Sequence, residues 1–123
     1  MNDLIRPTLY GSYHIILPEK INSESGSFID LEQKVKGRET DIVGPICETG
    51  DFFAKDRNLP AVKNGDILVI FSAGAYGYSM ASVYNSHPRP AEIIVRGKEY
   101  WQTTKRETYA DLVRQESIVN IRL

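Results

Sequence analysis

The sequence predicts a mainly β domain, an antiparallel barrel or sandwich with one short helix near its C-terminus. Residue types that favour strands (Val, Ile, Thr, Tyr, Phe and Trp) number 39, against 17 for Leu, Ala and Met, which favour helices. Short apolar runs recur between turn residues, and no long helical segments alternate with them. This pattern favours antiparallel strands joined by short connections.

Length and composition limit the classes of protein to consider. A chain of 123 residues fits one domain, residues 1–123, with one modest core. With 41% hydrophobic and 25% charged residues, the composition is that of a globular protein, and a net charge of -1 argues against a nucleic-acid partner. The sequence contains no membrane span or export signal, and its single cysteine cannot form an intrachain disulfide. We therefore expect a soluble protein of the reducing cytoplasm.

Five short apolar runs, each bounded by turn residues, are expected to form strands. They cover residues 14–17, 28–31, 41–43, 67–71 and 92–95. Gly65 and Gly97 each lie in a polar break, where tight turns with positive φ prefer glycine, so each should close a hairpin or a similar reversal. Residues 96–104 then form a return strand that pairs with residues 93–95.

Only two segments have a helical pattern. Residues 108–113 have the apolar spacing of a short amphipathic helix near the C-terminus. Residues 59–62 could form at most one turn. The domain should therefore be dominated by its strands.

Arg6 and Tyr10 form the first candidate for a binding site. A guanidinium and a phenol both donate hydrogen bonds to carboxylates, so the two side chains could converge on an anion. The alternative is an ordinary solvated terminal segment.

Cys47 and Glu48 form the second candidate, in a loop framed by glycine and proline at residues 44–51. A thiol can donate a proton or act as a nucleophile when its pKa is tuned, and a loop after a strand can present it. The alternative is a structural cysteine, because cysteines are often buried and inert.

Tyr76 is the third candidate, at the end of the most apolar predicted strand. Gly74 and Gly77 flank it, and such small residues let a backbone approach a ligand closely. The alternative is a tight turn with an aromatic plug, since the segment lacks the dinucleotide-binding glycine pattern. His14 and His87 lie far apart and accompany no second cysteine, so we expect no metal site.

Taken in order, these segments resemble the C-terminal part of the diaminopimelate decarboxylase family, fold-type III pyridoxal-phosphate enzymes of lysine biosynthesis. The resemblance covers nearly the whole chain, and it is the set of markers in this order that is specific. The markers are residues 1–7 with Tyr10, residues 43–51, residues 73–77, residues 84–86 with 89–92, and residues 106–109.

The resemblance implies a fold, a cofactor and partners. In the family a (β/α)8 barrel carries pyridoxal 5'-phosphate, and a second domain, a Greek-key antiparallel β-barrel, completes the site across a dimer interface. This chain resembles the second domain alone. It would accordingly contact the barrel domain of the same enzyme within a homodimer, and the enzyme would convert meso-2,6-diaminopimelate to L-lysine and CO2.

The resemblance also implies a role for each candidate residue. Cys47 would be the catalytic proton donor, and Arg6 and Tyr10 would contact the substrate. Glu48 would bind the distal amino group of the substrate, and Tyr76 would touch both cofactor and substrate. These roles agree with the chemistry of the residue types, because a thiol can protonate carbon and the charges of Arg6 and Glu48 suit a carboxylate and an ammonium.

Two alternatives remain from the sequence. Ornithine and arginine decarboxylases of the same family also have a cysteine in this loop but typically an aspartate after it, so Glu48 favours diaminopimelate. A non-catalytic β interaction module is the other alternative.

In the family the cofactor lysine belongs to the barrel, and the seven lysines here all lie in polar segments or at turns. We therefore expect the chain alone to be inactive and to expose an edge that a strand from the start of the full-length enzyme would cover.

Overall fold

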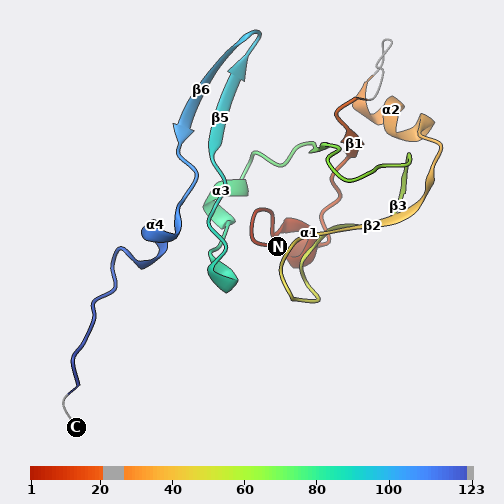
Figure 1. Cartoon of the computed structure of the whole chain (residues 1–123). Helices are drawn as coiled ribbons and strands as arrows, with labels where there is room; N and C mark the ends of the chain where they lie inside the picture. Colours follow the sequence, from red (N-terminus) through yellow and green to blue (C-terminus); the bar gives the residue numbers. More distant parts are fainter. Residues whose placement is uncertain (21–26, 122–123) are drawn as a thin grey trace.

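The computed structural model describes residues 1–20 and 27–121, which form short helices and antiparallel strand pairs (Figure 1). The helices are α1 (Arg6–Tyr10), α2 (Phe28–Lys34), α3 (Gly77–Met80), the 3-10 turn η1 (Tyr84–Ser86) and α4 (Tyr109–Val113). The strands are β1 (Ile16–Pro18), β2 (Arg38–Val43), β3 (Phe52–Leu59), β4 (Leu68–Ile70), β5 (Glu92–Arg96) and β6 (Glu99–Thr104).

The strands pair as three separate two-stranded antiparallel sheets in the described part of the chain: β1 with β4, β2 with β3, and β5 with β6. The β1–β4 pair joins distant parts of the sequence, with Leu17 opposite Val69. Antiparallel pairing is therefore confirmed. The described residues do not close by themselves into the barrel or sandwich that the sequence predicts.

Most of the predicted elements are present. The runs at residues 14–17, 41–43, 67–71 and 92–95 correspond to β1, β2, β4 and β5, and the return strand is β6. Gly97, with φ of 61°, makes the turn between β5 and β6. The C-terminal helix is α4, where the Thr108 hydroxyl accepts the backbone N–H of Asp111 and the Asp111 carboxylate accepts that of Thr108.

The prediction of a strand at residues 28–31 is wrong, because this segment is the first part of α2. Ser27 caps the helix, since its hydroxyl accepts the backbone N–H of Asp30 at 3.2 Å. The Asp30 carboxylate accepts the backbone N–H of Ser27 at 3.1 Å in return. This capping box satisfies donors at the helix N-terminus, and it prevails over the strand preference of Phe28 and Ile29.

The sequence prediction also missed β3, α1 and α3. In β3, Asp56 has a positive φ of 52°, and the pairing register with β2 shifts nearby. A bulge of this kind breaks the alternation by which a strand is recognised. Residues 60–62 are not helical, and the turn at Gly65 joins strands of different sheets, so it is a reversal and not a hairpin.

The β5–β6 hairpin projects from the rest of the molecule, and the C-terminal end also extends away from it (Figure 1). Arg89 and Glu107 fasten the base of the hairpin: the Arg89 backbone N–H and Nη2 donate to the two carboxylate oxygens of Glu107 at 2.9 and 2.5 Å. These hydrogen bonds lower the pKa of Glu107, which keeps its charge opposite Arg89. The Arg89–Glu107 hydrogen bonds therefore hold together the two chain segments from which the β5–β6 hairpin projects.

The core is small and lies around β1, β3 and the N-terminal segment. Its buried apolar residues are Leu4, Pro7, Ile16, Leu17, Val35, Ala54 and Leu59.

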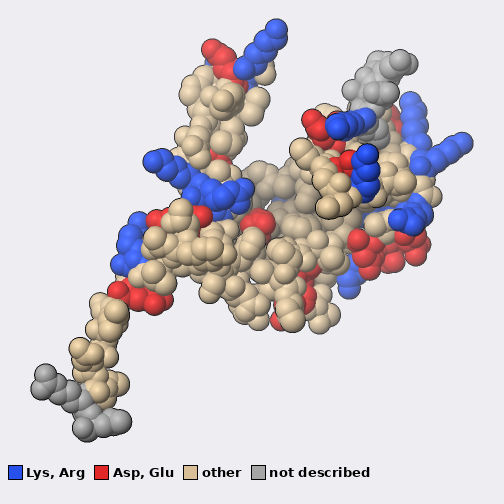
Figure 2. All heavy atoms as spheres, viewed as in Figure 1, with Lys and Arg blue, Asp and Glu red and all other residues tan. Residues whose placement is uncertain are grey.

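Acidic and basic side chains both occur on the face shown in Figure 2. In residues 1–20 and 27–121 no helix has the length and apolar character needed to cross a membrane.

Candidate active site

Helix α1 carries Arg6 and Tyr10 on the same face, because residues four apart are neighbours on a helix. Pro7 occupies the first turn, where its missing N–H costs nothing. Gly11 ends the helix in the left-handed conformation, φ 63°, and its backbone N–H donates to the carbonyl of Pro7 at 3.0 Å. The Arg6 side chain is half-buried and Tyr10 is exposed, so both can reach a ligand.

Cys47 and Glu48 lie on the outside of the loop at residues 44–51, between β2 and β3, and both are exposed. Backbone hydrogen bonds fold the loop tightly: Glu48 N–H donates to the Ile46 carbonyl at 2.8 Å, and Asp51 N–H donates to the Glu48 carbonyl at 3.0 Å. The free thiol of Cys47 is thus presented to solvent. The structural alternative, a cysteine packed in the core, is not what this chain shows.

Asp51 organises the loop from inside. Its buried carboxylate accepts the backbone N–H of Ile46 at 2.7 Å and the N-terminal ammonium of Met1. Burial raises the pKa of Asp51, but the hydrogen bonds from Met1 and Ile46 and the nearby positive charge outweigh it, so the pKa lies below its usual value. Gly44 leaves room for this carboxylate, because a Cβ there would lie 2.2 Å from Asp51 Oδ2.

A side-chain hydrogen bond joins α1 to the Cys47 loop. Thr8 lies between Arg6 and Tyr10 in sequence, and its hydroxyl donates to the carbonyl of Gly50 at 2.5 Å. The salt bridge between Met1 and Asp51 ties the start of the chain to the same loop. The first and second candidate segments therefore lie together.

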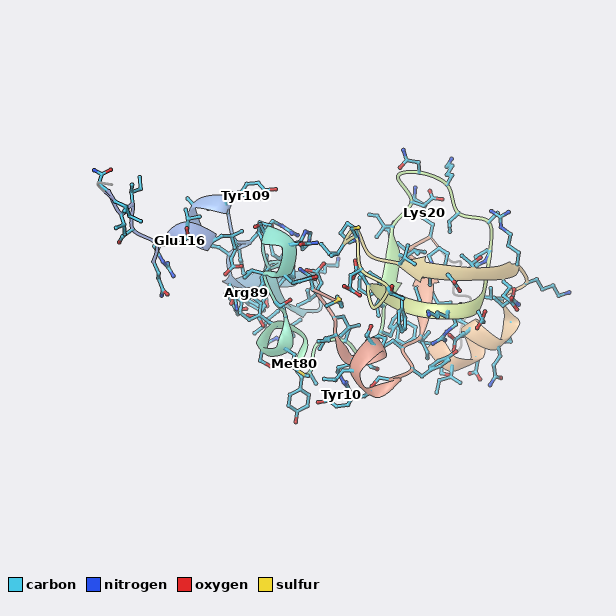
Figure 3. The ribbon with its side chains drawn as sticks, turned by 90° about the horizontal axis from the view of Figure 1, so that it is seen from below. Tyr10, Lys20, Met80, Arg89, Tyr109 and Glu116 are labelled. Carbon is cyan, nitrogen blue, oxygen red and sulfur yellow. The ribbon has the colours of Figure 1, made fainter. Side chains whose placement is uncertain are left out.

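Tyr76 has a left-handed backbone, φ 63°, at the start of α3, and the residue is 68% exposed. The segment after α3 is held by Asn2, which is buried: Asn2 accepts the backbone N–H of Ser82 at 3.0 Å, and its side chain donates to the carbonyl of Tyr84 at 2.7 Å. Both Figure 1 and Figure 3 draw the α3–η1 segment beside α1. The segment that follows α3 is thus held next to the N-terminal residues.

Asn2 and Thr8 make the hydrogen bonds that join these segments, and sequence reasoning assigned them no such role. In the described residues no hydrogen bond or ion pair joins any two of the five candidate side chains to each other. Glu48 makes a bond within its own loop, where Oε1 accepts the Gly50 N–H at 3.5 Å. The side chains are therefore free to contact a ligand.

The residues present fit one side of a pyridoxal cofactor. Tyr76 offers an exposed ring in an open turn, since a Cβ at Gly74 or Gly77 would meet nothing within 4 Å. The three segments contain no lysine, the residue to which pyridoxal phosphate attaches covalently. They suit contact with a cofactor held elsewhere and do not suit its covalent attachment.

Comparison with known proteins identifies the family of the chain. Residues 1–74 match the model of the pyridoxal-dependent decarboxylase C-terminal sheet domain. The chain belongs to this family. A diaminopimelate decarboxylase of Methanothermobacter thermautotrophicus is 44% identical over 95% of the chain, and one of Zymomonas mobilis is 45% identical over 97%.

Solved structures with the same fold also cover nearly the whole chain. A crystal structure from Aquifex aeolicus covers 97% of the chain with a TM-score of 0.82 and 43% identity. A diaminopimelate decarboxylase from M. jannaschii, solved in complex with L-lysine, covers 97% of the chain with a TM-score of 0.77 and 38% identity. The chain spans 25% of each of the two named decarboxylase sequences and 27% of the Aquifex aeolicus chain.

Proposed function

We propose that this chain supplies the C-terminal sheet domain of a diaminopimelate decarboxylase, which converts meso-2,6-diaminopimelate to L-lysine and CO2. The observation that carries the proposal is the combination of an exposed Cys47–Glu48 pair with Arg6 and Tyr10 on an adjoining helix. Identity of 44% to a diaminopimelate decarboxylase over 117 residues supports it.

Each candidate residue has a role in the proposed reaction. Arg6 and Tyr10 donate hydrogen bonds to a substrate carboxylate, and Glu48 accepts them from the distal ammonium. Such a pair of opposite charges selects a substrate with a second amino-acid centre far from the reacting one. Tyr76 contacts both the cofactor and the substrate.

Cys47 carries the chemical step assigned to this chain. When bound, pyridoxal phosphate accepts the electron pair that departure of CO2 leaves on the α-carbon. The Cys47 thiol donates its proton from Sγ to that carbon, which completes the new C–H bond, and the resulting thiolate regains a proton from solvent. The exposed position of Cys47 allows this contact.

The proposal includes the rest of the enzyme. A cofactor-binding barrel would supply the lysine and the phosphate site, and a second subunit would complete the site in a homodimer. Within the enzyme the strand pairs of this chain would join a strand from the start of the polypeptide and close into a Greek-key barrel. Each separate two-stranded sheet has edges that such a partner strand can cover.

The proposal is tested with the full enzyme that contains this chain, supplied separately with meso-diaminopimelate, ornithine and arginine. We expect CO2 release and L-lysine formation from diaminopimelate, and no comparable turnover of the other two. Faster turnover of ornithine or arginine would assign the chain to the other decarboxylases of the family. Absence of turnover with every substrate would favour a non-catalytic interaction module. The 123-residue chain alone is the negative control.

A further inference from the structure

We propose that Arg57 is a positioning residue for the substrate-binding helix, acting through Tyr13 to fix the end of α1 against β3. The guanidinium carbon of Arg57 lies 3.4 Å from the centre of the Tyr13 ring, and its Nη1 donates to Glu32 Oε1 at 3.3 Å. Tyr13 follows Gly11, the C-cap of α1, by two residues. This inference rests on the proposed function, in which α1 carries Arg6 and Tyr10.

Helix α1 needs contacts outside itself to stay in place. It has five residues, and its N-cap residue Ile5 makes no side-chain capping bond. Isolated helices of this length are not stable in water. Its position therefore depends on the buried Pro7, on the Thr8–Gly50 bond and on whatever fixes the chain after Gly11.

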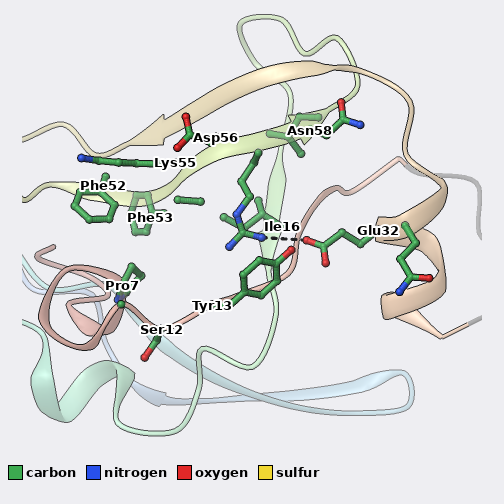
Figure 4. Close-up of a pocket in the computed structure, with 15 residues that line it drawn as sticks. Pro7, Ser12, Tyr13, Ile16, Glu32, Phe52, Phe53, Lys55, Asp56 and Asn58 are labelled. Atoms are coloured by element: carbon green, nitrogen blue, oxygen red, sulfur yellow. Dashed lines mark hydrogen bonds and ion pairs between the residues drawn. The ribbon is translucent and has the colours of Figure 1, made fainter.

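Core packing holds β1, where Ile16 and Leu17 are buried, but not the short link directly after α1, where Gly11 and Tyr13 are exposed. A cavity of about 590 Å³ lies between the α1 side and β3, and its wall includes Pro7, Gly11, Tyr13 and Arg57 (Figure 4). An open cavity leaves these residues without dense apolar contacts on that side. The stacked pair Tyr13–Arg57 is a specific contact between this link and β3.

The backbone of β3 directs Arg57 to this place. Ala54 and Leu59 are buried and Arg57 is half-buried, while residues 55, 56 and 58 are exposed. Strict alternation from Ala54 would turn residues 56 and 58 inward instead. The bulge at Asp56, whose backbone N–H donates to Asp41 Oδ1 at 2.9 Å, shifts the alternation by one residue and brings Arg57 to the α1 side.

Glu32 holds the guanidinium in its stacked position. The Arg57 and Glu32 side chains are 14% and 22% exposed, so solvent screens their attraction only in part. Tyr13 is 64% exposed, and partial desolvation together with the nearby Glu32 raises the pKa of its phenol. A planar guanidinium can stack on a ring and donate at its edge at the same time, which a lysine ammonium cannot.

The test uses the full enzyme with the variants Arg57→Met, Tyr13→Leu and Tyr13→Phe. We expect Arg57→Met and Tyr13→Leu each to raise KM for meso-diaminopimelate about tenfold, with kcat within about twofold of wild type, because they disturb binding groups and not Cys47. Tyr13→Phe retains the ring and should keep the wild-type KM. Lys55→Met is the matched control, since it removes another cation above a ring of β3, Phe52 at 4.5 Å.

A merely structural role makes a different prediction. It would lower the thermal midpoint and the amount of folded enzyme, with KM unchanged per folded molecule, and that result would overturn the inference. Equal losses of kcat and kcat/KM would overturn it as well. Hydrogen exchange at the backbone amides of Gly11 and Ser12 provides a readout without activity, and we expect faster exchange in Arg57→Met than in Lys55→Met. If the wild-type enzyme has no decarboxylase activity, the proposed function fails, while this exchange comparison still decides the positioning role.

Discussion

Asp51 is the residue on which the shape of the Cys47 loop depends. Its carboxylate is surrounded by donors from two parts of the chain, the Met1 ammonium and the Ile46 backbone, while Cys47 and Glu48 point outward. A buried carboxylate that loses its partners is costly, because its charge is then neither hydrated nor paired. The loop is thus built around a residue that takes no part in the proposed chemistry.

Asp51 should make the stability of the chain depend on pH. Its pKa is lowered in the folded state, so its contribution is present above the unfolded value of about 3.9 and is lost as the pH falls through the folded value. We expect Asp51→Asn to reduce the free energy of unfolding by about 1–3 kcal/mol at pH 7. Urea unfolding of both proteins between pH 7 and pH 3, followed by circular dichroism, measures this.

The two stability curves should converge toward low pH, because protonated Asp51 then resembles asparagine. A constant difference at every pH would mean that the charge of Asp51 does not contribute. Asp41→Asn is the control, since Asp41 also accepts a backbone N–H but is exposed.

Cys47 and Glu48 should separate kinetically in the full enzyme. Removing a general acid typically costs about 10²–10⁴-fold in rate, so Cys47→Ala should lower kcat far more than it raises KM. Glu48→Gln removes the charged partner of the distal ammonium, so it should chiefly raise KM and relax selectivity. Steady-state kinetics beside thermal melts measure both effects. Wild-type turnover per folded molecule in Cys47→Ala would remove Cys47 from the mechanism.

The site was predictable from residue types only up to a point. The sequence suggested Arg6, Tyr10, Cys47, Glu48 and Tyr76, because their side chains suit the chemistry of a carboxylate, a proton or a ring. It gave no sign that Asn2 bonds to Tyr84, 82 positions away, or that Met1 pairs with Asp51, 50 positions away. Such contacts arise from tertiary folding and leave no local pattern.

At the scale of elements, two predictions failed for structural reasons. A capping box made a helix of residues expected to form a strand, and a bulge that depends on strand pairing hid β3. The Ser27–Asp30 capping box was visible as a spacing, yet two apolar residues inside it favoured a strand. The bulge in β3 depends on Asp41 of the neighbouring strand, so the β3 sequence alone cannot reveal it. Runs with plain alternation and a glycine turn, such as β5 and β6, were predicted correctly.

The connection between α2 and β2 should be intolerant of any side chain at Gly37. A Cβ there would lie 1.7 Å from the backbone oxygen of Leu59, so β3 would have to move. We expect Gly37→Ala to lower the free energy of unfolding by about 3 kcal/mol, as overpacking does when the neighbour is backbone. Denaturant unfolding at low micromolar concentration measures it.

Gly74→Ala is the matched control, because a Cβ at Gly74 would meet nothing within 4 Å. It should change the free energy of unfolding by less than about 0.5 kcal/mol. Equal effects of the two substitutions would show that the close approach of Leu59 does not explain the requirement for glycine at position 37, because the smaller entropy of an unfolded chain with alanine favours folding at both positions.

At the scale of the whole molecule, the β5–β6 hairpin exposes apolar side chains on both of its faces. Ile94 pairs with Trp101 and Val95 with Tyr100, and all four are between 47% and 74% exposed. Successive residues of a strand point to opposite faces, so neither face of the hairpin is polar. A two-stranded sheet of this kind is marginally stable without a covering partner. In the proposed enzyme the barrel domain or the second subunit would provide that cover.

The isolated chain should therefore self-associate. We expect the weight-average mass in sedimentation velocity to rise with concentration, because apolar patches that lack their partner bind one another. The double variant Ile94→Lys, Trp101→Glu makes one face of the hairpin polar while keeping an attractive cross-strand pair. It should sediment closer to a monomer, whereas Lys98→Gln at the hairpin turn should behave as the unmodified chain does. A clean monomer at high concentration in the unmodified chain would contradict the prediction, and equal association of the double variant would assign the contact to another surface.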